Sequence, residues 1–126
     1  MTRDAVLEEV KRRFGTSPDY PWADEPTYAV LRHPDNQKWY GLLMRLPRQK
    51  LGLDEAGEVE ILNLKCDPVL LGALRGKEGI LPAYHMNKEH WFTVLLDRFS
   101  ADEELRQLID LSYQLTQSRR RPKEKR

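Results

Sequence analysis

An amphipathic helix pattern near each end of the sequence, with strand-like segments between, constrains the fold of this chain most strongly. In the first pattern apolar side chains recur every three or four residues, as on one face of a helix. They are Val6, Leu7, Val10 and Phe14. Thr2 can accept hydrogen bonds from free amides of the first turn, and Gly15 can end a helix in the left-handed conformation. We therefore predict a helix over residues 3–14.

The second helix pattern lies near the C-terminus. Its face is formed by Leu105, Leu108, Ile109, Ser112 and Leu115. Ser100 followed by Glu103 has the spacing of a capping box, in which each side chain bonds the backbone amide of the other residue. This pattern predicts a helix from Ala101 to about Ser118 that begins with the capping box.

Four segments between these helices have strand composition, with β-branched and aromatic residues bounded by turn residues. They are residues 27–33, 38–46, 58–65 and 90–96. Residues 34–36 supply a turn that joins the first two segments as a hairpin. Asp67 and Pro68 begin a short helix after the third strand, whereas residues 76–88, interrupted by glycine and proline, are expected to be irregular.

The second strand of the hairpin alternates, which assigns its side chains to two faces of a sheet. One face carries Tyr40, Leu42, Met44 and Leu46, and the other carries Trp39, Gly41, Leu43 and Arg45. One of these faces belongs to the core. Helices and strands together predict an α+β fold, with an antiparallel sheet packed against N- and C-terminal helices and a short helix inserted between strands.

Length and composition fit a single domain over residues 1–118. The 126 residues are 40% hydrophobic and 33% charged, so the chain can bury one core and keep a charged surface. No apolar run approaches the roughly 20 residues that a membrane span needs, and the N-terminus lacks the apolar stretch of a signal peptide. With Cys66 as its only cysteine the chain has no internal disulfide. We expect a soluble cytoplasmic protein with no membrane partner.

The net charge of +1 is distributed unevenly along the chain. Of 21 basic and 20 acidic side chains, six and one lie in residues 119–126, which leaves 15 against 19 in residues 1–118 and a net charge of −4 there. The basic tail cannot bury a core, and we predict that it is disordered. It could add affinity for nucleic acid through counterion release, or it could be a solubilising end.

The histidines and the cysteine are the first candidates for a metal site or a nucleophile. His85 and His90 lie five residues apart, which matches neither the helical nor the strand spacing of metal ligands, and we predict no metal and no cofactor. Cys66 precedes the free amides of the helix that begins at Asp67, which would lower its pKa, so a Cys66–His85 nucleophile is conceivable. The alternative is a small buried side chain at a strand end. We favour a protein that is not an enzyme.

Basic and aromatic side chains are frequent in and beside the hairpin and around His85. Arginine and lysine donate to phosphates, exposed aromatic rings stack on bases, and β-ribbons enter DNA grooves. The candidate nucleic-acid-binding residues are Arg32, Lys38, Trp39, Arg45, Arg48, Lys50, Lys65, Lys88 and Trp91. Ordinary surface charge with half-buried tryptophans is the alternative interpretation.

Several stretches of the sequence are more distinctive than these patterns. They are Trp22 and residues 28–30, 32–33, 38–40, 62–68, 82–91 and 111–116. Together they resemble the MmcQ/YjbR family of small bacterial proteins over nearly the whole chain up to about residue 118, most specifically over residues 84–91. The resemblance implies a frataxin-like (CyaY-like) fold and a proposed double-wing mode of DNA binding.

Two functional hypotheses follow from these observations. In the first, the chain is a non-enzymatic DNA-binding protein whose hairpin and adjacent loop contact the phosphate backbone of duplex DNA. In the second, it is a binding module for a small anionic ligand or a protein partner, with a pocket around His85. The residues proposed for that pocket are Trp39, Lys65, Tyr84, His85, Asn87, Lys88 and Trp91.

Overall fold

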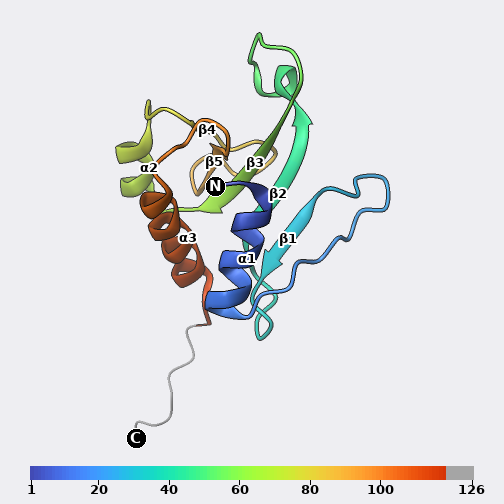
Figure 1. Ribbon diagram of the computed structural model, residues 1–126. Helices are drawn as coiled ribbons and strands as arrows, with labels where there is room; N and C mark the ends of the chain where they lie inside the picture. The colour runs from blue at the N-terminus through green and yellow to red at the C-terminus, as the bar shows by residue number, and fades with distance from the viewer. Residues whose placement is uncertain (119–126) are drawn as a thin grey trace, which may run out of the picture.

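An antiparallel sheet of five strands, in the order β1-β2-β3-β5-β4, forms the centre of the molecule. The computed structural model describes residues 1–118; the basic tail and its predicted disorder lie outside the described residues. The strands are β1 (Ala29–Arg32), β2 (Trp39–Pro47), β3 (Glu58–Lys65), β4 (Ile80–Pro82) and β5 (Trp91–Leu95). The helices are α1 (Arg3–Phe14), α2 (Pro68–Leu74), α3 (Asp102–Thr116) and the short 3-10 helix η1 (Arg48–Leu51). The predicted α+β fold is confirmed (Figure 1).

The first helix has both of its predicted caps. Thr2 Oγ1 accepts a hydrogen bond from the Ala5 amide at 3.1 Å, and Gly15 closes the helix with a φ of 70°. α1 lies beside α3 on one face of the sheet (Figure 1), where the rings of Phe14 and Tyr113 stack with centroids 3.8 Å apart. Two segments from opposite ends of the chain therefore share one layer.

The start of α3 differs from the prediction. The N-cap is Ala101, which makes no side-chain capping bond, and Ser100 is exposed. Glu103 is paired instead with Arg106, one turn later, at 3.1 Å. The predicted capping box is wrong. The acidic residues in the first turn of α3 nevertheless stabilise the helix, because they lie at the positive end of its dipole.

A bulge in β2 changes the direction of its first side chains. Leu31 and Arg32 of β1 pair with Gly41 and Trp39, which leaves Tyr40 as an extra residue. Tyr40 therefore joins the helix-side core, whereas Trp39 packs on the opposite face of the sheet. The predicted alternation is wrong at these two positions, because a strict two-residue period does not allow for a bulge.

A serine from α3 completes the end of the sheet beside this bulge. The β2–β3 ladder ends at the pair Gly41–Leu64. Beyond it, the Ser112 hydroxyl accepts a hydrogen bond from the Lys65 amide at 2.9 Å and donates to the Tyr40 carbonyl at 2.5 Å. Ser112 thus takes the place of a ladder bond between the two strands.

Both faces of the sheet are apolar. The helix-side core includes Val6, Val10, Tyr40, Leu43, Leu62, Leu64, Phe92, Val94, Leu105 and Ile109. A second cluster on the other face consists of Val30, Leu42, Met44, Leu46, Val59, Ile61 and Leu95. None of the three α-helices of residues 1–118 contributes a residue to this second cluster. Side chains from three connections, one of which contains η1, pack on it, namely Trp22, Tyr28, Leu51, Leu53, Tyr84 and Met86. The connections therefore shape the surface on this side of the molecule.

The edge strand β4 lies within the segment that was expected to be irregular. Its three residues pair with β5 through Leu81–Thr93 and the two flanking pairs, so the prediction is wrong for residues 80–82. A strand of three residues is too short to show an alternating pattern. No helix of residues 1–118 has the length and apolar character needed to cross a membrane.

Candidate functional site

A cationic cleft lies where η1 approaches the connection between β4 and β5. Its volume is about 260 Å³, and it is lined by Lys50, Leu51, Leu81, Pro82, Ala83, Tyr84, His85 and Lys88. An adjoining hollow of about 340 Å³ shares Leu81, Pro82 and Lys88 and adds Leu71, Arg75, Gly76 and Ile80. Among residues 1–118, no carboxylate lines either hollow. Both hollows are therefore positively charged, although residues 1–118 as a whole carry a net negative charge.

Lys88 is oriented by the connection to which it belongs. Its Nζ donates a hydrogen bond to the Ala83 carbonyl at 2.8 Å. An ammonium group has three hydrogens, so two remain for a ligand. Lys50 lines the same cleft, and Arg75 lines the adjoining hollow; both are exposed and make no ion pair within residues 1–118. The cleft can therefore offer several donors to one anion.

His85 and Tyr84 form a stacked pair at the wall of the cleft. Their ring centroids are 4.0 Å apart and their planes differ by 12°. His85 has a φ of 58°, in the left-handed region that non-glycine residues rarely adopt. Asn87 shapes the next turn, since its Oδ1 accepts a hydrogen bond from the Glu89 amide at 2.8 Å.

Three hydrogen bonds connect the stacked pair to the sheet. Thr93 Oγ1 donates to Asn63 Oδ1 at 2.5 Å and accepts a bond from the Tyr84 amide at 2.9 Å. Asn63 Nδ2 in turn donates to the Tyr84 carbonyl at 3.0 Å. Asn63 and Thr93 are both fully buried, so this closed ring satisfies polar groups that would otherwise be costly to bury. It also fixes the backbone of Tyr84 at its amide and its carbonyl.

The structure brings together only part of the pocket proposed from sequence. Tyr84, His85 and Lys88 line the cleft, and Asn87 shapes the same connection. The other three proposed residues lie elsewhere: Lys65 Nζ sits 5.6 Å from the ring centroid of the buried Trp91, and Trp39 packs on Trp22. They form aromatic contacts and do not line the cleft.

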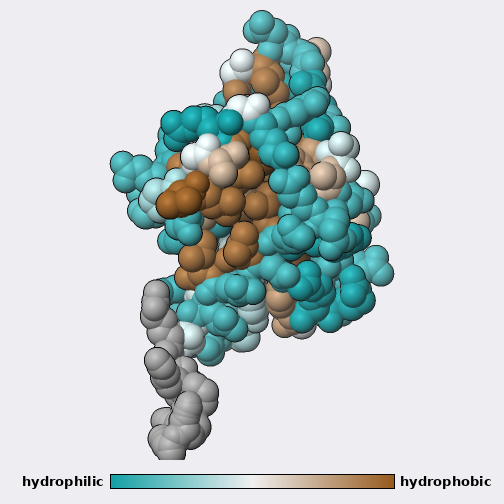
Figure 2. Space-filling view, turned by 90° about the vertical axis from the view of Figure 1, so that its left-hand side faces the viewer, coloured by the Kyte–Doolittle hydropathy of each residue, from teal (hydrophilic) through white to brown (hydrophobic). Residues whose placement is uncertain are grey.

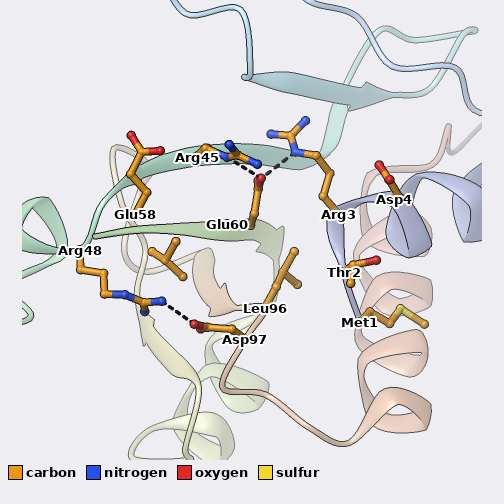
Figure 3. Close-up of a pocket in the computed structure, with 11 residues that line it drawn as sticks. Met1, Thr2, Arg3, Asp4, Arg45, Arg48, Glu58, Glu60, Leu96 and Asp97 are labelled. Atoms are coloured by element: carbon orange, nitrogen blue, oxygen red, sulfur yellow. Dashed lines mark hydrogen bonds and ion pairs between the residues drawn. The ribbon is translucent and has the colours of Figure 1, made fainter. Parts of the chain in front are cut away.

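All three arginines proposed to contact DNA are paired with carboxylates. Arg3 and Arg45 both point toward Glu60 in the hollow drawn in Figure 3, which has a volume of about 580 Å³. Arg3 Nε lies 2.9 Å from Glu60 Oε1, and Arg45 Nε lies 2.9 Å from Glu60 Oε2. Arg48 in the same hollow pairs with Asp97 at 2.5 Å. The hollow thus has mixed charge, unlike the cationic cleft.

The remaining residues of the DNA-binding set are placed differently from one another. Arg32 pairs with Asp19 at 2.8 Å and lies over the Trp39 ring, 5.9 Å from its centroid. Lys38 is exposed in the β1–β2 turn. Of the nine residues in that set, only Lys50 and Lys88 line the cleft.

Cys66 is poorly suited to act as a nucleophile. It is 1% exposed, and burial raises the pKa of its thiol to about 11. The expected lowering of its pKa by the start of α2 is therefore wrong, because desolvation of the thiolate dominates. No group of three or more histidine, cysteine or acidic side chains within residues 1–118 could hold a metal ion.

An apolar surface lies over α2 and α3. Figure 2 shows apolar side chains gathered on the side of the molecule that carries these helices. Val69 is 84% exposed, and Leu111 and Leu115 are each more than two-fifths exposed. These side chains have no donor for an anion, so this surface differs in chemistry from the cleft.

Sequence patterns did not indicate all of the residues that build the cleft. In the sequence, nothing distinguishes Leu51 and Leu81 from other apolar residues, and Arg75 is indistinguishable from an ordinary surface charge after a short helix. Asn63 left a signal, since it is a polar residue inside an apolar strand. Such a residue needs a partner when buried, and here its partners are Thr93 and Tyr84.

Comparison with known proteins decides the family. The model of the YjbR family matches residues 13–115. The chain belongs to the YjbR family. The resemblance to the MmcQ/YjbR family is thereby confirmed.

Several similar proteins match nearly the whole chain. The protein YyaQ of Bacillus subtilis is 52% identical over 116 residues, which cover 92% of this chain and 98% of YyaQ. A crystal structure of a Pseudomonas syringae protein matches with a TM-score of 0.90 and 48% identity, over 93% of this chain and 100% of that one. A Deinococcus radiodurans protein matches with a TM-score of 0.70 and 28% identity, over 98% and 85% of the two chains. Proteins of Pseudomonas syringae and Deinococcus radiodurans therefore have a fold similar to that of this chain.

Proposed function

We propose that the protein is a non-enzymatic binding module for a phosphate-bearing anion, which it holds in the cationic cleft. One observation carries this proposal: Lys50, Lys88 and Arg75 line two adjoining hollows that contain no carboxylate from residues 1–118. Of the other basic residues in residues 1–118, nine are paired with acidic groups. Unpaired cations gathered at one place favour an anion.

The chemistry of the cleft supports binding rather than catalysis. Lys88 keeps two ammonium hydrogens after its bond to Ala83, and Lys50 can approach the same ligand from η1. No activated nucleophile lines the cleft among residues 1–118, since Cys66 is buried elsewhere with a raised pKa. Because Cys66 is a free thiol, we also propose the reducing cytoplasm as the place of action.

The test uses inorganic pyrophosphate as a probe, titrated into the full chain and followed by isothermal calorimetry or NMR. We expect salt-sensitive binding that weakens at least about ten-fold in the K50A/K88A double variant, since a charge-assisted hydrogen bond contributes about 1.5–3 kcal/mol. K38A is the matched control, because Lys38 is an equally exposed lysine in the β1–β2 turn. Equal affinity of the double variant and the wild type would refute the assignment.

Duplex DNA is a second candidate, supported by a different part of the structure. Asn36 Nδ2, in the β1–β2 turn, donates to the Thr116 carbonyl at 3.0 Å. The end of α3 therefore lies beside the turn that carries Lys38, and six basic residues follow residue 118 in the sequence. The family resemblance implies a CyaY-like fold and a double-wing mode of DNA binding. In this second candidate the β1–β2 hairpin contacts the phosphate backbone of the duplex.

The two candidates respond to different variants. If a short duplex is bound through the hairpin, then K38A and deletion of residues 119–126 should weaken binding and reduce its salt dependence, as measured by fluorescence anisotropy. K50A/K88A should have a smaller effect on that binding. Absence of duplex binding at low ionic strength would refute the second candidate and leave the first untouched.

A further inference from the structure

His85 presents an aromatic ring to the cleft with one of its faces already covered. Tyr84 lies against that face, with ring planes only 12° apart. His85 is exposed and lines the cleft, so a planar ligand that stacks on it would use the ring face away from Tyr84. An open aromatic face backed by a second ring is a platform on which a planar group can stack, and nucleobases stack on such platforms whatever their identity.

This platform is held in place before any ligand arrives. The Tyr84 backbone is bonded on both sides, to Thr93 Oγ1 through its amide and to Asn63 Nδ2 through its carbonyl. His85 follows directly in the left-handed conformation, with a φ of 58°. Unusual backbone conformations of this kind are retained where the surroundings determine them, and they are frequent at ligand sites. A fixed platform also lowers the entropy cost of binding.

The phosphate donors and the platform line the same cleft. Lys50 and Lys88 supply charge, His85 supplies the aromatic face, and Leu51 and Leu81 supply apolar wall. We propose that the anion bound here is a nucleoside monophosphate, with its base stacked on His85 and its phosphate between the two lysines. This inference rests on the proposed function and specifies the class of anion.

The small size of the cleft favours a single nucleotide over a strand of several. At about 260 Å³ it lies just below the roughly 300–1,000 Å³ of pockets for drug-sized ligands. A strand of several nucleotides would need a longer groove with a series of stacking rings. Only His85 and Tyr84 contribute rings to the cleft among residues 1–118, and these two rings are stacked on each other.

The experiment compares adenosine monophosphate with ribose 5-phosphate on the full chain by calorimetry. The two probes share sugar and phosphate, so their difference isolates the base. We expect the nucleotide to bind about ten-fold more tightly to the wild type. The variant H85N should bind both probes equally, because asparagine tolerates the left-handed backbone but has no aromatic ring. H90N is the matched control and should keep the preference, since His90 does not line the cleft.

Each outcome separates this inference from the proposed function. Equal affinity of the wild type for both probes would overturn the nucleotide assignment and leave phosphate binding standing, whereas no affinity for either would overturn both. A preference that persists in H85N would remove His85 from the site. In the wild type, NMR should also show contacts between adenine protons and the His85 ring; tight binding without them would refute the stacking.

Discussion

Replacing Ser112 by alanine should destabilise the protein far more than an ordinary serine-to-alanine change. The Ser112 hydroxyl serves two backbone groups, the amide of Lys65 and the carbonyl of Tyr40, at the point where the β2–β3 ladder ends. Ser112 is fully buried, so neither group can turn to water when the hydroxyl is removed. An unsatisfied buried polar group costs about 1–3 kcal/mol. We expect S112A to lose about 2–4 kcal/mol of the free energy of unfolding.

Urea denaturation followed by circular dichroism measures this loss, and S100A provides the control. Ser100 is exposed and precedes the N-cap Ala101, so its replacement should change stability by less than about 0.5 kcal/mol. For a chain of this length, the loss in S112A corresponds to a fall in melting temperature of very roughly 10 °C. If S112A loses less than about 1 kcal/mol, or S100A loses as much as S112A, the role assigned to the Ser112 hydroxyl is incorrect.

Three further predictions concern buried groups. Burial lowers the pKa of His33 below 6.5, so the unfolded state binds a proton more strongly than the folded state, and the free energy of unfolding should be highest above about pH 6.5 and fall as the pH is lowered. Urea titrations at several pH values should show a steeper fall for the wild type than for H33Q. Parallel plots of the free energy of unfolding against pH would contradict this role of His33. Cys66 should react with a thiol reagent only as fast as the protein unfolds, so immediate labelling in native buffer would show that it is accessible. A Cβ added to Gly79 would lie 2.9 Å from the Phe99 backbone, whereas a Cβ added to Gly57, which has a similar φ, would have no atom within 4 Å. G79A should therefore lower the free energy of unfolding by at least about 1 kcal/mol more than G57A. Equal melting temperatures of the two variants would contradict this contact.

Features of the fold that depend on neighbouring residues were predictable from the sequence. The helix α1 has its cap at Thr2 and its end at Gly15 as expected, because both signals act within one turn of the helix. The bounds of β3 are likewise those predicted. The bulge at Tyr40 could not be predicted, since it depends on the register with β1 and on a hydroxyl from α3 that lies 72 residues away in sequence.

The candidate site could be predicted only in part, for the same reason. Residues 84–91 attracted attention through their composition, and Tyr84, His85 and Lys88 do line the cleft. Lys50 lies on the other wall because the end of the β2–β3 hairpin approaches the same face of the sheet. Nothing local connects Lys50 with His85. Conversely, Lys65 and Trp91 looked available for a ligand and instead pack on each other.

The hydroxyl of Ser112 has a consequence for how the chain folds. The groups that it joins belong to β2 and β3, yet it is carried by the last helix. Lys65 and Ser112 are separated by 47 residues. During synthesis, the hydrogen bonds at the end of the β2–β3 hairpin can therefore form only after these further residues have been added to the chain. Contacts of such long sequence separation slow folding and leave apolar strands exposed in the meantime. The nascent chain should accordingly be vulnerable to aggregation and proteases until α3 has emerged from the ribosome.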